Sequence, residues 1–176
     1  MELQRGLAAE QNDPEIHFLI AESLFALGRL DEAADSYSAS LDLRPAFPEA
    51  LCNFGCLRRV QGKSATAIEI LEKAVALKPD FVTALSALAF VLHDCNRAVD
   101  TASIVKRAIQ IDPSCSDLYL NLGQIIRSLP AGTEDEALTL TCKALVLKAD
   151  SPAALNNLGA IYEGRGEFLI ARSIYE

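Results

Sequence analysis

Two cysteines with an asparagine between them stand at residues 52–56, where the sequence reads Cys-Asn-Phe-Gly-Cys. If this segment is helical, Cys52 and Cys56 lie one turn apart and face the same side. Two thiols could begin a metal site, but structural zinc takes four ligands, and only His93 is available as a third. A disulfide is disfavoured, because helical geometry points the two side chains poorly for bonding. We interpret both cysteines as small, weakly polar surface residues, and we expect neither a metal nor another cofactor.

Two further patterns could indicate catalysis, and neither fits. The Gly-Lys-Ser sequence at residues 62–64 resembles the end of a phosphate-binding loop, but that loop needs a preceding strand and a glycine where this chain has Leu57. His93 has no cysteine or serine placed as a nucleophile, and Asp94 beside it is the only acid that could orient it. The sequence therefore predicts that the chain is not an enzyme.

The composition is that of a globular protein with an acidic surface. Of its 176 residues, 51% are hydrophobic and 23% are charged, and the net charge is −8. An acidic surface repels phosphate backbones and anionic lipids, so we expect no nucleic-acid partner. No apolar run approaches the roughly 20 residues of a membrane helix, so we expect no membrane insertion. The five cysteines lack the spacing of a disulfide framework, and the first residues lack a secretory signal. We predict a cytoplasmic protein, unless a signal has been removed.

Residues of the same kind recur along the chain at intervals of 34. Glycine or asparagine, which tolerate the left-handed backbone of a tight turn, stands at Gly28, Gly62 and Asn96. Small residues form three more columns, with two extra residues between Thr101 and Ala137: Ala21, Gly55, Ala89, Gly123 and Gly159; Ala33, Ala67, Thr101, Ala137 and Ala171; Ser40, Ala74, Ala108 and Ala144. Small side chains in register are needed where two helices approach closely, so the sequence predicts a repeat protein.

Each repeat carries the signals of two helices. The first helix begins at a cap or a proline, as at Asp13-Pro14 and Ser151-Pro152. The second ends at the Leu-x-Leu-x-Pro type of pattern seen in LDLRP, VALKP and IQIDP, because proline cannot continue a helix. The fourth repeat has a loop longer by two residues, in which Pro130 ends one helix and Thr133 with Glu136 can form a capping box for the next. We favour a longer loop without a function of its own. The alternative is a change in superhelical twist or an exposed contact loop.

The segments NLGQII, NLGAIY, DEAADSY and DEALTL together resemble the tetratricopeptide repeat family. Its first helix carries a bulky residue, Leu-Gly and then an aromatic residue or leucine, and its second helix carries alanines and an aromatic before a final proline. The resemblance implies an all-α fold, an α-solenoid of stacked antiparallel helix pairs in a right-handed superhelix. We place the second helix of a preceding partial repeat at 1–13 and repeats at 14–47, 48–81, 82–115, 116–151 with the two-residue insertion, and 152–176, truncated.

The resemblance also implies that the first helices line a groove that binds peptides. Their second, fifth, sixth, ninth and later positions would face the bound chain. Our candidate groove residues are Phe18, Glu22, Phe25, Asn53, Cys56, Arg59, Phe90, His93, Asn121, Gln124, Arg127 and Asn157. The phenylalanines would supply apolar anchors. The asparagines would bind peptide backbone, because an amide both donates and accepts hydrogen bonds, and the arginines could select an acidic side chain.

The predicted function is a protein–protein interaction scaffold that binds an extended or helical segment of a partner in this groove. Asn53, Asn121 and Asn157 share one repeat position, although Leu19 and Ala87 interrupt the row. A continuous row of such asparagines, and the segments RPAFPEALCNFG and NNLGAIYEGRGE, resemble the repeats of O-linked N-acetylglucosamine transferases. The alternative function is therefore the substrate-recognition arm of a larger enzyme such as a protein glycosyltransferase. The amides could also be surface groups that are satisfied by water or by neighbours.

Two expectations concern particular partners. Family members that bind heat-shock chaperones hold a C-terminal carboxylate with lysine, arginine and asparagine from successive first helices. No three consecutive first helices here supply the cationic pair, so we predict no binding to chaperone tails. Ile170, Ile174 and Tyr175 have no following repeat to cover them, so we predict self-association through the uncapped C-terminal end.

Overall fold

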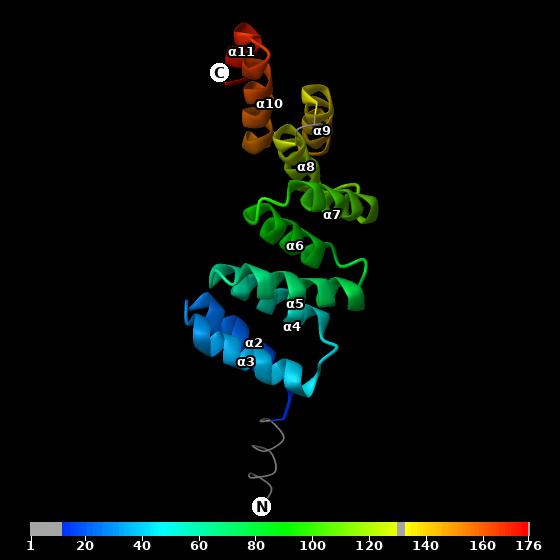
Figure 1. The fold of residues 1–176 in the computed structure, drawn as a ribbon. Coiled ribbons are helices and arrows are strands. Elements are labelled where there is room, and N and C mark those ends of the chain that lie inside the picture. The colour runs from blue at the N-terminus through cyan, green and yellow to red at the C-terminus, as the bar shows by residue number, and fades with distance from the viewer. Residues whose placement is uncertain (1–11, 130–132, 176) are drawn as a thin grey trace, which may run out of the picture. The chain divides into compact units, whose positions relative to one another are not determined.

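The computed structural model of the chain describes residues 12–129 and 133–175. Within these ranges the chain forms ten α-helices and no β-strand (Figure 1). It divides into two compact units, Met1–Val91 (unit 1) and Leu92–Glu176 (unit 2). The boundary falls near the C-terminal end of one helix, α6 (Val82–Asp94). None of the helices in the described ranges has the length and apolar character that crossing a bilayer requires.

Unit 1 is built from two helix hairpins and most of α6. The hairpin helices are α2 (Pro14–Ala26), α3 (Leu30–Leu43), α4 (Pro48–Val60) and α5 (Ser64–Leu77). Helix α2 packs on α3 and α4 packs on α5, while α3 also contacts α4 and so joins the two hairpins. The first helices α2 and α4 touch as well, which brings their side chains to one common face.

Unit 2 repeats this arrangement. Its helices are α7 (Ala98–Ile111), α8 (Ser116–Ser128), α9 (Glu134–Leu147), α10 (Pro152–Gly164) and α11 (Phe168–Tyr175). Helix α8 pairs with α9 and α10 pairs with α11, while the contacts of α7 with α8 and of α9 with α10 join successive hairpins. The predicted all-α solenoid of stacked helix pairs is confirmed.

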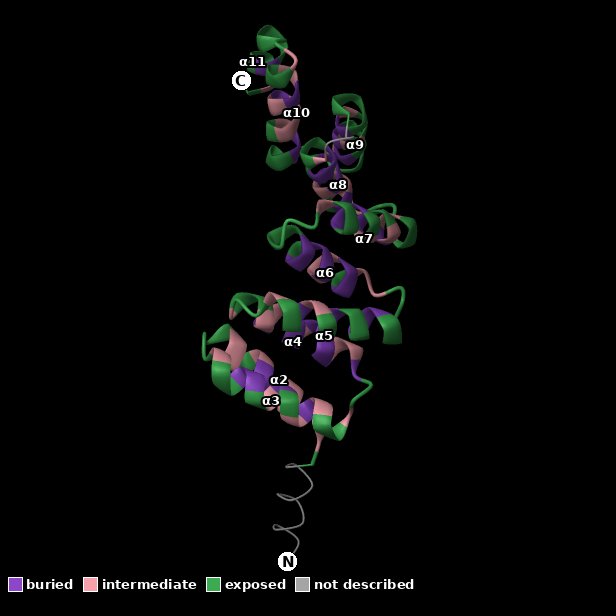
Figure 2. Cartoon of the chain, viewed as in Figure 1, coloured by how far each residue is buried: buried purple, intermediate pink, exposed green. Residues whose placement is uncertain are grey.

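The turns between paired helices have the backbone that the sequence pattern predicts. Gly28 and Gly62 both have φ of 74°, and Asn96 has φ of 57°, in the left-handed region where glycine and asparagine are favoured. Gly166, which the pattern did not single out, has φ of 77° in the last hairpin. Figure 2 shows these turns as exposed, while the buried residues lie along the helices.

The columns of small residues lie inside the hairpins, where the two helix backbones approach each other. All of them are buried, including the two that carry hydroxyls, Ser40 and Thr101. The approach is closest at Gly55, where a methyl group would lie 2.5 Å from Cγ of Leu71 on α5. Small side chains therefore set how closely each first helix packs on its second helix, as the sequence predicts.

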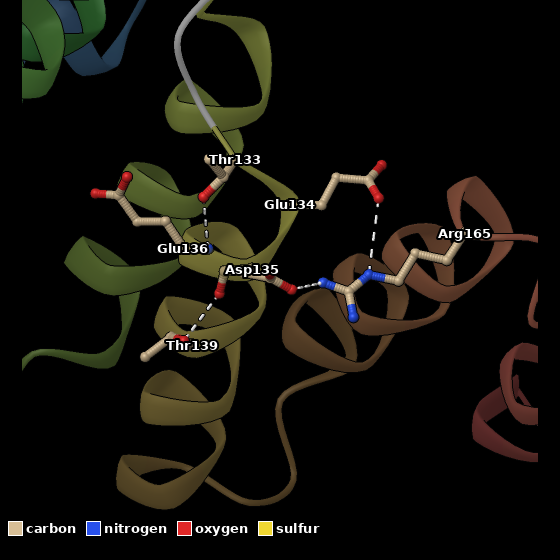
Figure 3. Close-up of polar contacts among 6 residues, drawn as sticks. All are labelled: Thr133, Glu134, Asp135, Glu136, Thr139 and Arg165. Atoms are coloured by element: carbon tan, nitrogen blue, oxygen red, sulfur yellow. Dashed lines mark hydrogen bonds and ion pairs between the residues drawn. The ribbon is translucent and has the colours of Figure 1, made fainter.

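Side-chain caps fix the start of three helices. Asp13 Oδ1 accepts a hydrogen bond from the backbone N–H of Glu15, and Ser151 Oγ accepts one from Ala154. Thr133 Oγ1 accepts a hydrogen bond from the backbone N–H of Glu136 at 3.1 Å (Figure 3). This bond confirms the Thr133 half of the predicted capping box. The carboxylate of Glu136 lies 3.8 Å from Lys106 Nζ on α7. The predicted role of Pro130 lies outside the described residues.

Replacing Thr133 by alanine is expected to lower the free energy of unfolding by about 1 kcal/mol, because the first turn of α9 loses its acceptor. Thr133→Ser keeps the acceptor and is the matched control. Urea denaturation followed by circular dichroism measures both variants, and hydrogen exchange at Glu136 reports the cap itself. Equal losses in the two variants would show that the threonine methyl, and not the cap, stabilises this helix start.

Candidate functional site

The twelve predicted groove residues all lie on the first helices of the hairpins or on α6. We call the surface formed by these residues the first-helix face. Phe90 belongs to unit 1 and His93 to unit 2, so each unit carries its own part of this face. Cys56 and the three asparagines are partly buried, while Arg59, Phe90, His93, Gln124 and Arg127 are exposed.

In unit 1 the first-helix face contains a polar contact between α2 and α4. Asn53 Nδ2 donates a hydrogen bond to Glu22 Oε1 at 2.9 Å, and both side chains are partly buried. This contact uses one amide hydrogen of Asn53, and an amide side chain can make further hydrogen bonds both as a donor and as an acceptor.

Beneath this contact lies a tyrosine hydroxyl without a partner. Tyr37 on α3 is 0% exposed, and its hydroxyl makes no hydrogen bond to any described residue. Burial is the main cause that raises the pKa of Tyr37, and the negative charge of Glu22 raises it further. The Asn53 amide is close enough to oppose this shift, but the geometry gives the Tyr37 hydroxyl no hydrogen-bond partner among the described residues. Unit 1 therefore presents a buried donor that a bound acceptor could satisfy.

The two cysteines on α4 interact with each other. Cys52 is 1% exposed and Cys56 is partly buried, and the two residues lie one helical turn apart. The neighbouring Cys52 thiol is the main cause that lowers the pKa of Cys56, with help from the charge of Arg59 and against the effect of burial. The neighbouring Cys56 sulfur, followed by burial, raises the pKa of Cys52. No group of three or more His, Cys, Asp or Glu side chains among the described residues is arranged to bind a metal ion.

The three predicted apolar anchors differ in their surroundings. The Phe18 ring packs 5.1 Å from the Phe47 ring and 6.2 Å from the Tyr37 ring, measured between centroids, so it belongs to the packing between α2, α3 and the start of α4. Phe25 is partly buried, while Phe90 is 52% exposed. Phe90 is therefore the predicted anchor with the most surface available to a partner.

Unit 2 contains a second polar contact between successive first helices. Gln124 Nε2 on α8 donates a hydrogen bond to Asn157 Oδ1 on α10 at 3.0 Å. The amide nitrogen of Asn157 is buried and has no partner in the described part of the chain. Asn157 occupies the same repeat position as Asn53, so the same column places an amide between two first helices in both units.

Polar ties at the turns hold successive hairpins together. In unit 2, the Arg165 guanidinium binds Asp135 and lies 3.7 Å from Glu134, so the end of α10 is tied to the start of α9 (Figure 3). In unit 1, Gln61 after α4 donates to Asp31 on α3 at 2.9 Å. These ties help to position neighbouring first helices, and through them the amide contacts described above.

Sequence reasoning missed Tyr37 as part of the site. Its column continues with Leu71, Val105 and Thr141, so a phenol in a mostly apolar column was the available signal. Thr141 also carries a hydroxyl, but it donates to the Ala137 carbonyl at 2.8 Å within its own helix. A phenol hydroxyl is too far from the backbone of its own helix to do the same. The lack of a hydrogen-bond partner for its buried hydroxyl, and not the residue type alone, therefore identifies Tyr37 as part of the site.

Comparison with known proteins gives consistent results. A family model described as tetratricopeptide repeat matches residues 2–48, and a second with the same description matches residues 48–81. Human tetratricopeptide repeat protein 7B is 26% identical over 133 residues, which cover 76% of this chain and 16% of that protein. Mouse protein O-mannosyl-transferase TMTC1 is 32% identical over 85 residues, which cover 44% of this chain and 9% of that protein. The chain thus spans less than a fifth of either relative's length.

A solved structure extends the likeness beyond the segments that the family models match. The crystal structure of MamA protein superimposes with a TM-score of 0.81 at 25% identity, and the match covers 95% of this chain and 89% of that one. Repeat models, relatives and fold therefore agree, and the chain belongs to the tetratricopeptide repeat family.

Proposed function

We propose that the chain is a non-catalytic scaffold that binds an extended or helical segment of a partner protein on its first-helix face. A tetratricopeptide fold supports a role in protein–protein interaction in general. The observation that supports the specific proposal is that each unit has a buried donor without a partner among the described residues close to this face. These donors are the Tyr37 hydroxyl, which lies behind Glu22 and Asn53 in unit 1, and the Asn157 amide in unit 2. An unpaired buried donor costs about 1–3 kcal/mol, and a peptide carbonyl would remove that cost.

A polypeptide backbone fits these donors better than a small anion does. Both donors are neutral and lie beside an acceptor that is already engaged, Glu22 Oε1 in unit 1 and Asn157 Oδ1 in unit 2. The Glu22 carboxylate would repel an anion, whereas a peptide carbonyl carries no net charge. Phe90 adds an exposed apolar surface for a partner side chain, and Arg59 and Arg127 offer positive charge to an acidic one.

Peptides selected from a random display library on the intact chain provide the test. Asn157→Ala and Phe90→Ala are expected to weaken binding of the selected peptides at least about tenfold, measured by fluorescence anisotropy. Glu72→Ala, an exposed change on the second helix α5, is the matched control and should leave affinity unchanged. The proposal fails if both first-helix variants bind like the wild type while changes on second helices abolish binding.

The second candidate is the substrate-recognition arm of a larger protein-modifying enzyme. The match to protein O-mannosyl-transferase TMTC1 favours this candidate. The matched segment is 9% of that protein, so most of the relative lies outside the repeats that this chain resembles. In this case the same face would bind an acceptor polypeptide for a catalytic domain elsewhere in the chain. A full-length coding sequence that contains a glycosyltransferase domain would support this candidate, and one without a catalytic domain would remove it.

Self-association through the C-terminal end stays a prediction. Phe168, Leu169, Ile170 and Tyr175 on α11 are exposed, which gives that helix an apolar surface. Sedimentation velocity over a range of protein concentrations would detect the association.

A further inference from the structure

The amide contacts between successive first helices are equivalent in the repeat, but they differ in charge. Glu22 and Gln124 share one repeat position, and Asn53 and Asn157 share another. In unit 1, Asn53 Nδ2 donates to a carboxylate oxygen, Glu22 Oε1, at 2.9 Å. In unit 2, the contact at 3.0 Å joins two neutral amides. The first-helix face of unit 1 therefore carries a negative charge at the place where unit 2 is neutral.

The ion pairs described in unit 1 do not include Glu22. They engage three other carboxylates: Glu15 with Arg44, Glu32 with Arg29, and Glu49 with Lys78. Helix α2, which carries Glu22, contains no lysine or arginine. A carboxylate can accept several hydrogen bonds at its two oxygens, so a further donor can join the Asn53 amide. Within the described part of unit 1, Glu22 is thus a partly buried anion whose hydrogen-bond partner is neutral.

A second observation points to a ligand at the same place. The Tyr37 ring lies between Phe18 on α2 and Phe54 on α4, at centroid distances of 6.2 Å and 5.8 Å. These two helices also carry Glu22 and Asn53. The Tyr37 hydroxyl is buried without a hydrogen-bond partner among the described residues, and burial followed by the charge of Glu22 raises its pKa. A bound chain that accepts a hydrogen bond from this hydroxyl would run beside the Glu22 carboxylate.

We propose that the partner segment bound by unit 1 carries a basic side chain, lysine or arginine, that pairs with the Glu22 carboxylate. This inference rests on the proposed function and names the side chain that the first-helix face of unit 1 selects. An acidic side chain at this place would be repelled by Glu22. An apolar side chain would cover a partly buried charge without pairing it.

The charge of the whole chain acts in the same direction, but it can be separated from the pair. The net charge of −8 attracts basic segments before any contact forms. Salt screens this long-range attraction strongly, whereas a partly buried pair is screened much less. A charge removed elsewhere on the surface should therefore have little effect on which peptides bind, while a charge removed at Glu22 should change the selection.

The first test selects peptides from a random display library on the intact wild-type chain and, separately, on Glu22→Gln. Glutamine keeps the length of the side chain and an oxygen that can accept from Asn53, so the substitution removes the charge. Glu72→Gln is the matched control, because it removes the same charge from an exposed position on the second helix α5. Peptides selected on the wild type and on Glu72→Gln should contain more lysine and arginine than those selected on Glu22→Gln.

The second test measures the affinity of one selected peptide by fluorescence anisotropy. Each lysine and arginine of the tightest wild-type peptide is replaced by glutamine in turn. One of these replacements is expected to weaken binding to the wild type about tenfold and to change binding to Glu22→Gln by less than about twofold. General attraction to an acidic chain would instead give every replacement a similar effect on both chains, and high salt would remove that effect.

Circular dichroism confirms that Glu22→Gln folds, and the peptide replacements on the wild-type chain test the proposal if it does not. Two results would overturn the proposal. One is an equal content of lysine and arginine in the peptides selected on the wild type and on Glu22→Gln. The other is a set of replacements that all weaken binding to the same small extent.

These results can be told apart from a failure of the proposed function. If Asn157→Ala and Phe90→Ala weaken binding while Glu22→Gln changes nothing, the proposed function stands and the basic side chain alone is wrong. If no selected peptide depends on the first-helix face, both proposals fail.

Discussion

Truncating Tyr37 to alanine is expected to lower the free energy of unfolding by about 4 kcal/mol. The ring is fully buried and lies between the rings of Phe18 and Phe54, with centroid distances of 6.2 Å and 5.8 Å. Its removal leaves a cavity between α2, α3 and α4 that close-packed neighbours cannot fill. Urea denaturation followed by circular dichroism measures the decrease in the free energy of unfolding. Hydrogen exchange should show that the backbone amides of α2, α3 and α4 lose the most protection.

Tyr37→Phe separates the ring from the hydroxyl. Because the hydroxyl has no partner in the described structure, its removal should leave stability unchanged or raise it by about 1 kcal/mol. The same change should weaken peptide binding, because it removes the donor that we assign to a bound carbonyl. A loss of more than about 1 kcal/mol in Tyr37→Phe would mean that the hydroxyl is already bonded in the free protein.

Replacing Gly55 by valine is expected to lower the free energy of unfolding by about 3 kcal/mol. A Cβ atom at Gly55 would lie 2.5 Å from Leu71 Cγ and 2.9 Å from Leu71 Cδ2, and valine adds two more methyl groups there. Leu71 is fully buried, so it cannot move aside, and α4 must separate from α5. Leu71→Ala should lower the free energy of unfolding less in the Gly55→Val variant than in the wild type, because the substitution removes the Leu71 atoms that clash with the valine.

Gly123→Ala is the matched control, because Gly123 occupies the same column in unit 2. A Cβ atom there would meet the Ala137 carbonyl oxygen at 3.4 Å, which is an ordinary contact. Alanine also favours the helix over glycine by about 1 kcal/mol, so this variant should be unchanged or slightly more stable. If Gly55→Val and Gly123→Ala cost the same, the close approach of α4 and α5 does not limit residue size at Gly55.

The fold could be predicted largely from the sequence because it depends on local rules that repeat. Gly28, Gly62 and Asn96 mark turns because only a few residue types tolerate their backbone, and the structure has positive φ at all three. The columns of small residues mark the helix contacts because a larger side chain would not fit. Each signal is weak alone, and repetition at one interval makes it specific.

The site could be predicted only in part, because position on a helix face does not reveal what a side chain contacts. The pattern gives Phe18 and Phe90 the same role as groove anchors, yet Phe18 packs against the rings of Tyr37 and Phe47 while Phe90 is exposed. The Asn53–Glu22 and Gln124–Asn157 contacts join residues 31 and 33 positions apart, and the choice of partner depends on rotamers that a spacing does not encode.

We propose that a partner polypeptide binds on the first-helix face of each unit and hydrogen-bonds to the asparagine side chains there. The most direct measurement is a titration of the ¹⁵N-labelled chain with a selected peptide, following the side-chain NH₂ signals of asparagine and glutamine by NMR. We expect the Asn53 signal of unit 1 and the Asn121 and Asn157 signals of unit 2 to shift, while the signal of Gln110, exposed on the second helix α7, stays in place. Shifts at Gln110 and other second-helix residues, with the three asparagines unmoved, would contradict it.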